Sequence, residues 1–326
     1  MSSSCSRSAF DTTKALEGVV MTIIQILRCA SCKQAIDNTI KCKSCQRSLR
    51  DRDGNIALIG DPATSEYRVK YVPLEFVKDV VDATLCVPAD AGSSDIVYHL
   101  DKAHIPYFRA LPPGARVLEI GCGGAQMRQW VISQGFEYLG TDVSKTRVTE
   151  NLREFGGADF LSDAHNLPIM DHSIDLVYCA AVTEHLAAPH LVVQEIFRVL
   201  KRGGFFLGNC SFMEPWHDES FFHISPNGAV ELLMSTGFET VAIWPSYDYS
   251  GFKALSVMGN RATSLFRVTG TFNHFLSSCF NGFKRFIRRD NLSADLDYAK
   301  SLATTAGAID WVARKPSNGR LGEFQD

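Results

Sequence analysis

Short apolar runs alternate with segments in which apolar residues recur every three or four positions, from about residue 107 to the end of the chain. The runs predict buried strands, and the three-to-four spacing predicts amphipathic helices. We expect strands at 116–120, 138–142, 174–179, 205–208, 241–244 and 309–313, another ending near 161, and helices at 126–133, 191–200 and 230–234. Strands that alternate with helices predict an α/β fold with a doubly wound sheet.

Four of the ten cysteines lie close together near the N-terminus, as two Cys-x2-Cys pairs. Cys29 with Cys32, and Cys42 with Cys45, have the spacing that turns two sulfurs toward one tetrahedral zinc ion. Four thiolate ligands leave no open coordination position, so we expect a structural zinc site. The alternative is two redox-active or incidental cysteine pairs. The other six cysteines are scattered singly, which argues against a secreted disulfide scaffold and favours a cytoplasmic protein.

The segment around these cysteines has the length of a zinc ribbon. Residues 21–61 resemble the small zinc-ribbon domain that activates eukaryotic RNA and protein methyltransferases, with Ala30 where that family usually has proline. So short a unit cannot hold a core unaided, and the metal is expected to supply much of its folding energy. Residues 1–20 are Ser-rich and unpatterned, so we expect a disordered extension.

A glycine-rich turn follows the first expected strand. Gly121 and Gly123 stand in the run Glu-Ile-Gly-Cys-Gly-Gly that begins at Glu119, and a helical stretch follows. Such a turn lets the backbone approach a nucleotide closely. Asp142 ends the next strand, about 20 residues on, where a carboxylate can accept both ribose hydroxyls. The turn and the acid are therefore predicted to form one site.

Two cofactor classes use this geometry, and neighbouring residues separate them. A dinucleotide-binding turn favours a small residue three positions after Gly123, where this chain has Gln126. The pattern Glu119-x-Gly121-x-Gly123 instead resembles the first motif of class I S-adenosylmethionine (SAM) methyltransferases. The resemblance continues in order over about 200 residues. It implies a Rossmann-like, seven-stranded sheet whose final strand is antiparallel to the fifth.

The resemblance also implies a role for each residue around the cofactor. Gly121, Cys122 and Gly123 would line the methionine and ribose, and Glu119 would lie near the methionine ammonium or order the loop. Asp142 would hold the ribose hydroxyls. The adenine would contact Val143, which follows the second strand, and Asp163 and Ala164, which follow the third. The fourth strand would end at the cofactor with Cys179. Asp142 and Asp163 could instead be helix caps or turn residues.

The candidate catalytic residues are histidines that follow the fourth and fifth strands. His185 is the first choice for a base or an acceptor-orienting group, followed by His217 and His223 in a loop rich in aromatic residues. His185 could instead cap the next helix, and His223 could satisfy a buried hydrogen bond. Enzymes that methylate exocyclic amines place an Asn/Asp-Pro-Pro-aromatic motif after the fourth strand, whereas this chain has Cys-Ala-Ala-Val from Cys179. This departure favours oxygen or carbon acceptors.

Two further regions have no clear place in this scheme. Residues 62–106, with a helix expected at 75–84, link the ribbon to the catalytic domain, which we place at 107–326. Within it, 247–306 is too long for a simple connection and predicts a helical insertion. Its amphipathic stretch of Phe272, Leu276, Cys279, Phe280, Phe283, Phe286 and Ile287 ends in Lys284, Arg285, Arg288 and Arg289. A cap over the substrate pocket, a dimer contact, and a contact with a membrane surface or an anionic substrate remain open.

The charge balance limits the partners. Lys+Arg 33 against Asp+Glu 36 gives a net charge of −3, so no overall field attracts nucleic acid or anionic lipid. Residues 28–53 carry an excess of positive charge, which fits RNA contact or, more simply, a solvated surface. The sequence thus predicts a SAM-dependent methyltransferase acting on oxygen or carbon of a sugar, a lipid-linked molecule or a specialised metabolite. An RNA methyltransferase and a SAM-binding scaffold without turnover are the alternatives.

Overall fold

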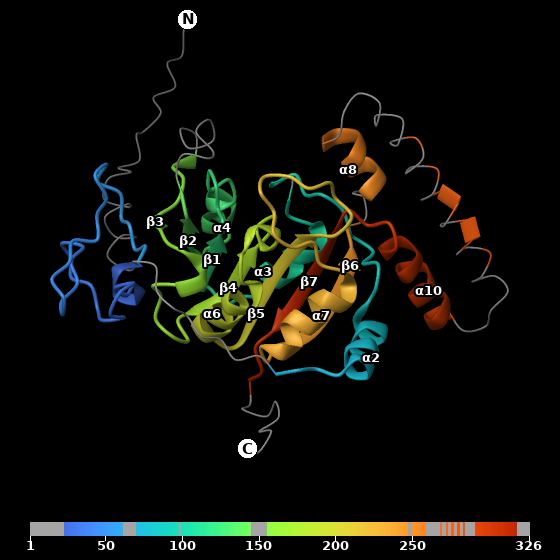
Figure 1. Cartoon of the computed structure of the whole chain (residues 1–326), viewed down its shortest axis with the longest axis horizontal. Coiled ribbons are helices and arrows are strands. Elements are labelled where there is room, and N and C mark those ends of the chain that lie inside the picture. Colours follow the sequence, from blue (N-terminus) through green and yellow to red (C-terminus); the bar gives the residue numbers. More distant parts are fainter. Residues whose placement is uncertain are drawn as a thin grey trace, which may run out of the picture.

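The computed structural model has a central sheet of seven strands in the order β3-β2-β1-β4-β5-β7-β6 (Figure 1). The structure describes residues 23–60, 70–97, 99–144, 155–246, 250–258 and 291–317, together with Val268, Phe272, Phe275, Leu276, Cys279, Phe280 and Phe283. The strands are β1 (Arg116–Ile120), β2 (Glu137–Asp142), β3 (Phe160–Leu161), β4 (Ile174–Cys179), β5 (Leu200–Ser211), β6 (Glu239–Pro245) and β7 (Ala308–Arg314).

The predicted doubly wound sheet is confirmed, including the orientation of its last strand. The strands from β3 to β5 run parallel, and β7 enters antiparallel between β5 and β6. Strands of a parallel sheet covered on both faces read as continuous apolar runs, and the last four residues of β1 and of β4 are all buried. The carboxyl ends of β1, β2, β4 and β5 therefore meet at one end of the sheet, where ligands of such folds bind.

Helices cover both faces of the sheet. They are α2 (Leu74–Thr84), α3 (Ile105–Arg109), α4 (Arg128–Ser133), α6 (Pro189–Val199), α7 (Pro226–Ser235), α8 (Gly251–Met258) and α10 (Asn291–Ala303). In α6 the periodic residues Val192, Ile196 and Val199 are buried, as the sequence pattern predicts. Short 3-10 helices lie at η1 (Lys102–His104), η2 (Ala164–Asn166) and η3 (Thr183–His185). Both η2 and η3 follow strands at the ligand-binding end of the sheet.

The segment before β1 packs against β6 and β7, at the opposite edge of the sheet from β3. Leu85, which follows α2, forms a parallel bridge with Ile243 in β6, and α2 contacts α7 and β6. His104 is fully buried against Trp244, and its Nε2 lies 3.1 Å from the carbonyl oxygen of Trp311 in β7. Residues 70–106 thus contribute to the core around β6 and β7.

The cysteine-rich segment docks on the β3 edge of the sheet, where Figure 1 shows it in blue. The backbone N–H of Leu58 donates to the carbonyl of Leu161, and the Leu161 N–H donates to Ile56, each at 2.8 Å. Farther along, the Arg28 N–H donates to the Pro168 carbonyl at 2.7 Å. These bonds pair the edge strand β3, which would otherwise expose free backbone groups.

The expected insertion is described only in part. Helices α8 and α10 lie within it, and the described side chains of Phe272, Phe280 and Phe283 are exposed. The basic cluster of Lys284, Arg285, Arg288 and Arg289 lies outside the described residues, as does the expected extension at 1–20. None of the helices in the described part of the chain has the length and apolar character needed to cross a bilayer.

Candidate functional site

The glycine turn after β1 is held by backbone bonds to the end of β2. The N–H groups of Gly121 and Cys122 both donate to the Thr141 carbonyl, at 2.9 and 3.1 Å. The N–H of Gly123 donates to Oδ2 of Asp142 at 3.0 Å. Both glycines have positive φ, +69° and +50°, which favours residues without a Cβ. Asp142 therefore fixes the turn and still has lone pairs on both carboxylate oxygens for a ligand.

Gly121 also touches the segment that follows β4. A Cβ placed on Gly121 would lie 2.2 Å from Cγ2 of Val182, which is far shorter than the van der Waals contact distance between two carbon atoms. Val182 immediately precedes η3, which contains Glu184 and His185. The glycine turn and the histidine-bearing segment are therefore in direct contact.

Glu119 lies beneath the turn and is almost fully buried. The Tyr138 hydroxyl donates to its Oε2, and Nε2 of His99 lies 3.8 Å from its Oε1. Burial, followed by the Glu119 charge, raises the pKa of the Cys122 thiol well above its usual value. Cys122 thus stays a neutral thiol against the loop.

The residues expected around the adenine lie in two places. Val143 follows Asp142 with its side chain 57% exposed. The Asp163 carboxylate caps η2 and accepts from Nδ1 of His165 at 2.7 Å, and this hydrogen bond lowers the pKa of Asp163. Ala164 follows as the first residue of η2. Cys179 is buried at the end of β4, where burial raises its pKa to about 12.

The three candidate histidines come from two segments, η3 and the loop after β5, and meet beyond β4 and β5. The ring centroids of His185 and His217 are 5.4 Å apart, and those of His217 and His223 are 6.0 Å apart. Nδ1 of His217 lies 2.8 Å from the carbonyl oxygen of Pro215. A carbonyl only accepts, so Nδ1 carries the hydrogen in this contact, and neutral His217 presents its Nε2 lone pair.

Two glutamates complete this cluster, and the sequence analysis did not single them out. Oε1 of Glu184 lies 3.0 Å from the Ser211 hydroxyl, and Oε2 of Glu214 lies 2.6 Å from it. Burial, with the nearby Glu184 charge adding to it, raises the pKa of Glu214. Glu214 Oε2 is also 3.6 Å from Nε2 of His217. The available signal was spacing: Glu184 directly precedes His185, and Glu214 stands three residues before His217.

The four clustered cysteines gather their sulfurs as the spacing predicts. Their sulfur atoms all lie within 4.8 Å of one another, with Cys29 and Cys45 3.8 Å apart and Cys32 and Cys42 3.3 Å apart. Burial raises the pKa of Cys42, but N–H groups of Cys45 and Ser44 point at its sulfur and lower the pKa to about 6. Four sulfur atoms gathered in this way fit a tetrahedral zinc site with four cysteine ligands.

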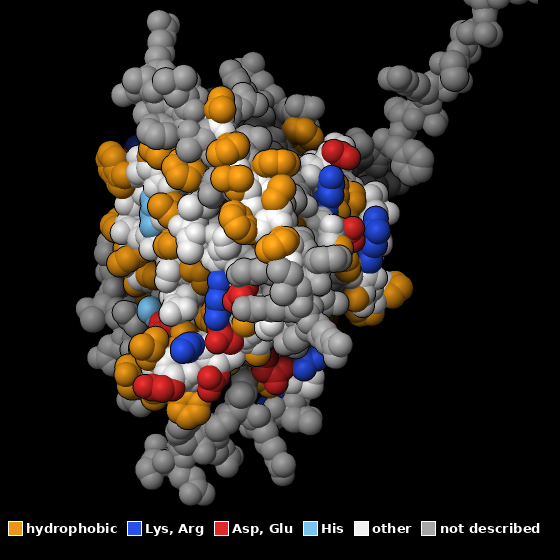
Figure 2. Space-filling view, turned by 90° about the vertical axis from the view of Figure 1, so that its right-hand side faces the viewer, with side chains coloured by type: hydrophobic (Ala, Val, Ile, Leu, Met, Phe, Trp, Pro, Cys, Tyr) orange, Lys and Arg blue, Asp and Glu red, His pale blue; other side chains and the backbone are white. Residues whose placement is uncertain are grey.

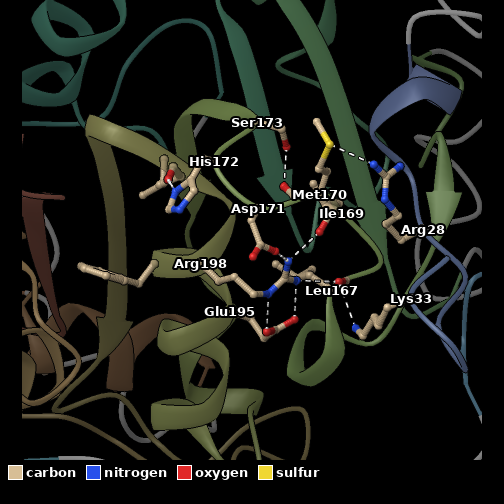
Figure 3. A network of polar contacts seen from close by, with 12 residues as sticks. Arg28, Lys33, Leu167, Ile169, Met170, Asp171, His172, Ser173, Glu195 and Arg198 are labelled. Atoms are coloured by element: carbon tan, nitrogen blue, oxygen red, sulfur yellow. Dashed lines mark hydrogen bonds and ion pairs between the residues drawn. The ribbon is translucent and has the colours of Figure 1, made fainter. Parts of the chain in front are cut away.

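A cavity of about 590 Å³ is lined by residues of the ribbon, of α6 and of the segment before β4. Arg198 of α6 is one of them. Its guanidinium donates to the Leu167 and Ile169 carbonyls and pairs with Asp171 and Glu195 (Figure 3). Lys33 reaches into the cavity from the ribbon, and burial lowers its pKa. Part of the positive charge of the ribbon therefore faces α6 and the segment before β4.

The sheet order, the glycine turn and the acid after β2 are the features that the sequence resemblance to class I methyltransferases implies. The family model described as "Methyltransferase domain" matches residues 118–208, from β1 through most of β5. Residues 118–208 are therefore similar to a methyltransferase domain.

Curated relatives match the same region. Over 129 residues the chain is 30% identical to sterol 24-C-methyltransferase erg6 of Schizosaccharomyces pombe, covering 36% of this chain and 32% of that protein. Over 99 residues it is 34% identical to 2-methyl-6-phytyl-1,4-hydroquinone methyltransferase of Synechocystis, covering 29% and 31%. The chain thus spans about a third of the length of these relatives. A solved SAM-dependent methyltransferase from Methanosarcina mazei is 15% identical with a TM-score of 0.43, covering 67% and 99%.

Proposed function

We propose that the protein is an enzyme that transfers the methyl group of SAM to an oxygen or carbon of a small-molecule acceptor. The observation that carries the proposal is the contact between Gly121 in the glycine turn and Val182, next to η3. It joins the expected cofactor loop to the histidine cluster at one end of the sheet. The methyltransferase-domain match, residues 118–208, includes Gly121, Val182 and His185, whereas His217 and His223 follow it.

The residues around the glycine turn suit SAM. The positive φ of Gly121 and Gly123 brings backbone close to where a ligand would lie, and Asp142 offers a carboxylate for the ribose hydroxyls. In the proposed complex Val143 and Asp163 contact the adenine, and Glu119 orders the loop from below. SAM supplies an electrophilic methyl group on its sulfonium. The chain has to hold the acceptor in line with that methyl.

The histidine cluster is placed to bind the reacting group of the acceptor. An oxygen acceptor must also lose a proton, and Nε2 of His217 has an available lone pair because Nδ1 donates to Pro215. The ring of His185, on η3, has its centroid 5.4 Å from that of His217. We propose that these two side chains orient the acceptor, with His223 at the rim.

The surroundings of the cluster favour an apolar acceptor with one polar group. Met213, Trp216, Phe221 and Phe222 are all exposed, Trp216 by 75%, in the loop that bears His217 and His223. The face that carries α8 and α10 gathers hydrophobic side chains over its upper half (Figure 2). The relatives named above are sterol and hydroquinone methyltransferases. Together these observations support a lipid-like acceptor over a sugar.

We also propose that the cluster of four cysteines binds a structural zinc ion. Its support is the sulfur geometry, and the ribbon contacts with Leu161 and Pro168 give the metal a role in holding the sheet edge. All four ligands come from the protein, so the ion supplies no chemistry to the transfer.

The substitution Asp142→Asn tests the cofactor site. The amide oxygen can still accept the Gly123 N–H, whereas the charged acceptor for the ribose is lost. A hydrogen bond to a charged group contributes about 1.5–3 kcal/mol, so SAM affinity measured by calorimetry should fall roughly 10- to 100-fold. The matched control is Asp53→Asn in an exposed turn of the ribbon. Unchanged affinity would remove Asp142 from the site.

The acceptor class is tested by incubating the full chain with labelled SAM and separated lipid, water-soluble small-molecule and RNA fractions. We expect label in the lipid fraction. Label in RNA alone would replace the proposal with an RNA methyltransferase. Tight SAM binding with no labelled product in any fraction would replace it with a SAM-binding scaffold.

A further inference from the structure

We propose that Glu184, His185 and His217 form a binding site for one divalent transition-metal ion, separate from the cysteine cluster. One ligand atom from each residue lies within 4.8 Å of the other two. The inference deepens the proposed function, on which it rests, by placing an ion where the acceptor's polar group would bind. Metal binding can be measured without turnover, so the two proposals fail independently.

The first observation is an orphaned carboxylate oxygen. Glu184 is only 2% exposed, and its Oε1 contacts the Ser211 hydroxyl. Its Oε2 is buried and has no hydrogen-bond partner among the residues that the structure describes. Nδ1 of His185 is buried and unpartnered in the same way. An unpaired buried carboxylate is costly, and a cation held between the two side chains would remove that cost.

The second observation is the orientation of His217. Its Nδ1–H donates to the Pro215 carbonyl, so Nε2 presents a lone pair, and it does so 3.6 Å from the Glu214 carboxylate. A hydrogen lies between these two acceptors only if the ring or the Glu214 carboxyl is protonated. A metal-binding histidine usually donates its other ring N–H to a carbonyl or a carboxylate, as His217 does.

The third observation is the local charge. Glu184 and Glu214 both contact the Ser211 hydroxyl, which has a single proton and can donate to only one of them. Within the described part of the chain, no lysine or arginine pairs with either glutamate. The cluster therefore concentrates negative charge, and a divalent ion would neutralise it.

The donor set indicates the kind of ion. One carboxylate and two imidazoles suit Mn²⁺, Fe²⁺, Co²⁺ or Zn²⁺, whereas Mg²⁺ and Ca²⁺ prefer all-oxygen sites. Three protein ligands leave coordination positions open for an oxygen of the acceptor. The ion would lie beyond Val182, on the segment that touches the glycine turn.

Mn²⁺ is the probe, because the thiolates of the cysteine cluster prefer softer ions. The full chain, with zinc in the cysteine cluster, is titrated with Mn²⁺, and the free ion is followed by electron paramagnetic resonance. We expect one Mn²⁺ per chain, with affinity about tenfold or more weaker in Glu184→Gln and in His217→Ala. The matched control, His190→Asn, changes a histidine of α6 that pairs with Glu231 and should leave Mn²⁺ affinity unchanged.

Folding of each variant is checked by its thermal unfolding and its SAM affinity. If Glu184→Gln fails to fold, the test rests on His217→Ala, which changes a residue in a surface loop. The inference is overturned if the wild-type chain binds no Mn²⁺ at millimolar concentrations. Equal Mn²⁺ affinity in the wild type and in both cluster variants would also overturn it. If the chain transfers methyl groups but binds no Mn²⁺, the proposed function stands and only the inferred metal site is disproved.

Discussion

The buried histidine His104 predicts a specific loss of stability in mild acid. Its side chain is fully buried in η1 against Trp244, with ring centroids 4.8 Å apart. Nε2 donates to the Trp311 carbonyl, so neutral His104 has its lone pair on Nδ1, which has no partner in the described part of the chain. Burial lowers the pKa of His104 from 6.5 to about 4. A proton on Nδ1 would place an unpaired charge in the core.

The sign and size of the effect follow from linkage. The folded pKa is the lower one, so as the pH falls the unfolded chain binds the proton first. The stabilisation is therefore complete above pH 6.5 and is lost progressively as the pH falls toward 4. At about 1.4 kcal/mol per pKa unit, the full loss is roughly 3 kcal/mol, of which about 1.3 kcal/mol falls between pH 7.5 and 5.5.

The assay compares the wild type with His104→Gln, whose amide can still donate to Trp311. The free energy of unfolding is measured by urea denaturation at pH 7.5 and 5.5 for both proteins. Other titrating groups, including the cysteine cluster, contribute equally and cancel in the comparison. We expect the pH-dependent loss to be smaller in the variant by about 1.3 kcal/mol. Equal losses in the two proteins, or a His104 ring that titrates near pH 6.5 by NMR, would refute the reasoning.

Two further predictions concern the glycine turn and the ribbon. Gly121→Ala should lower both the melting temperature and SAM affinity, because a left-handed φ costs about 1–2 kcal/mol with a Cβ and the new methyl meets Val182. A second substitution, Val182→Ala, should recover only the part of the loss that comes from the contact between the new methyl group and Val182. Wild-type SAM affinity in Gly121→Ala would contradict the prediction. Chelation of the zinc ion proposed for the ribbon should speed amide exchange at Leu58 and Leu161, which bond the ribbon to β3. Cys86→Ser is the control that should keep the metal, and unchanged exchange in metal-free protein would disprove the coupling.

Much of the sheet could be predicted from the sequence. The runs at 116–120 and 174–179 match β1 and β4, because fully buried parallel strands are continuous apolar segments. β5 differs, since it begins at Leu200 rather than at residue 205. Leu200 pairs with Ile174 across a register irregularity in β4. That pairing depends on a partner strand distant in sequence, which a local pattern does not encode.

The candidate site shows the same division. Local motifs were sufficient to single out Asp142 and the glycine turn, because a strand, a turn and an acid at a set distance form a local pattern. The cluster of Glu184, Ser211 and Glu214 was not visible in this way. Its geometry arises where the ends of β4 and β5 meet, and burial there is what leaves Glu184 Oε2 without a partner.

The sequence by itself determined the α/β class, the methyltransferase-like motifs and the paired cysteines, since each rests on spacings of a few residues or on a strand-length apolar run. Only the tertiary structure decided that the ribbon pairs with β3 through Leu161 and that His185 and His217 converge. These contacts join segments separated by tens of residues or more. Their energies come from hydrogen bonds and burial between distant parts of the chain, which exist only once the sheet has formed.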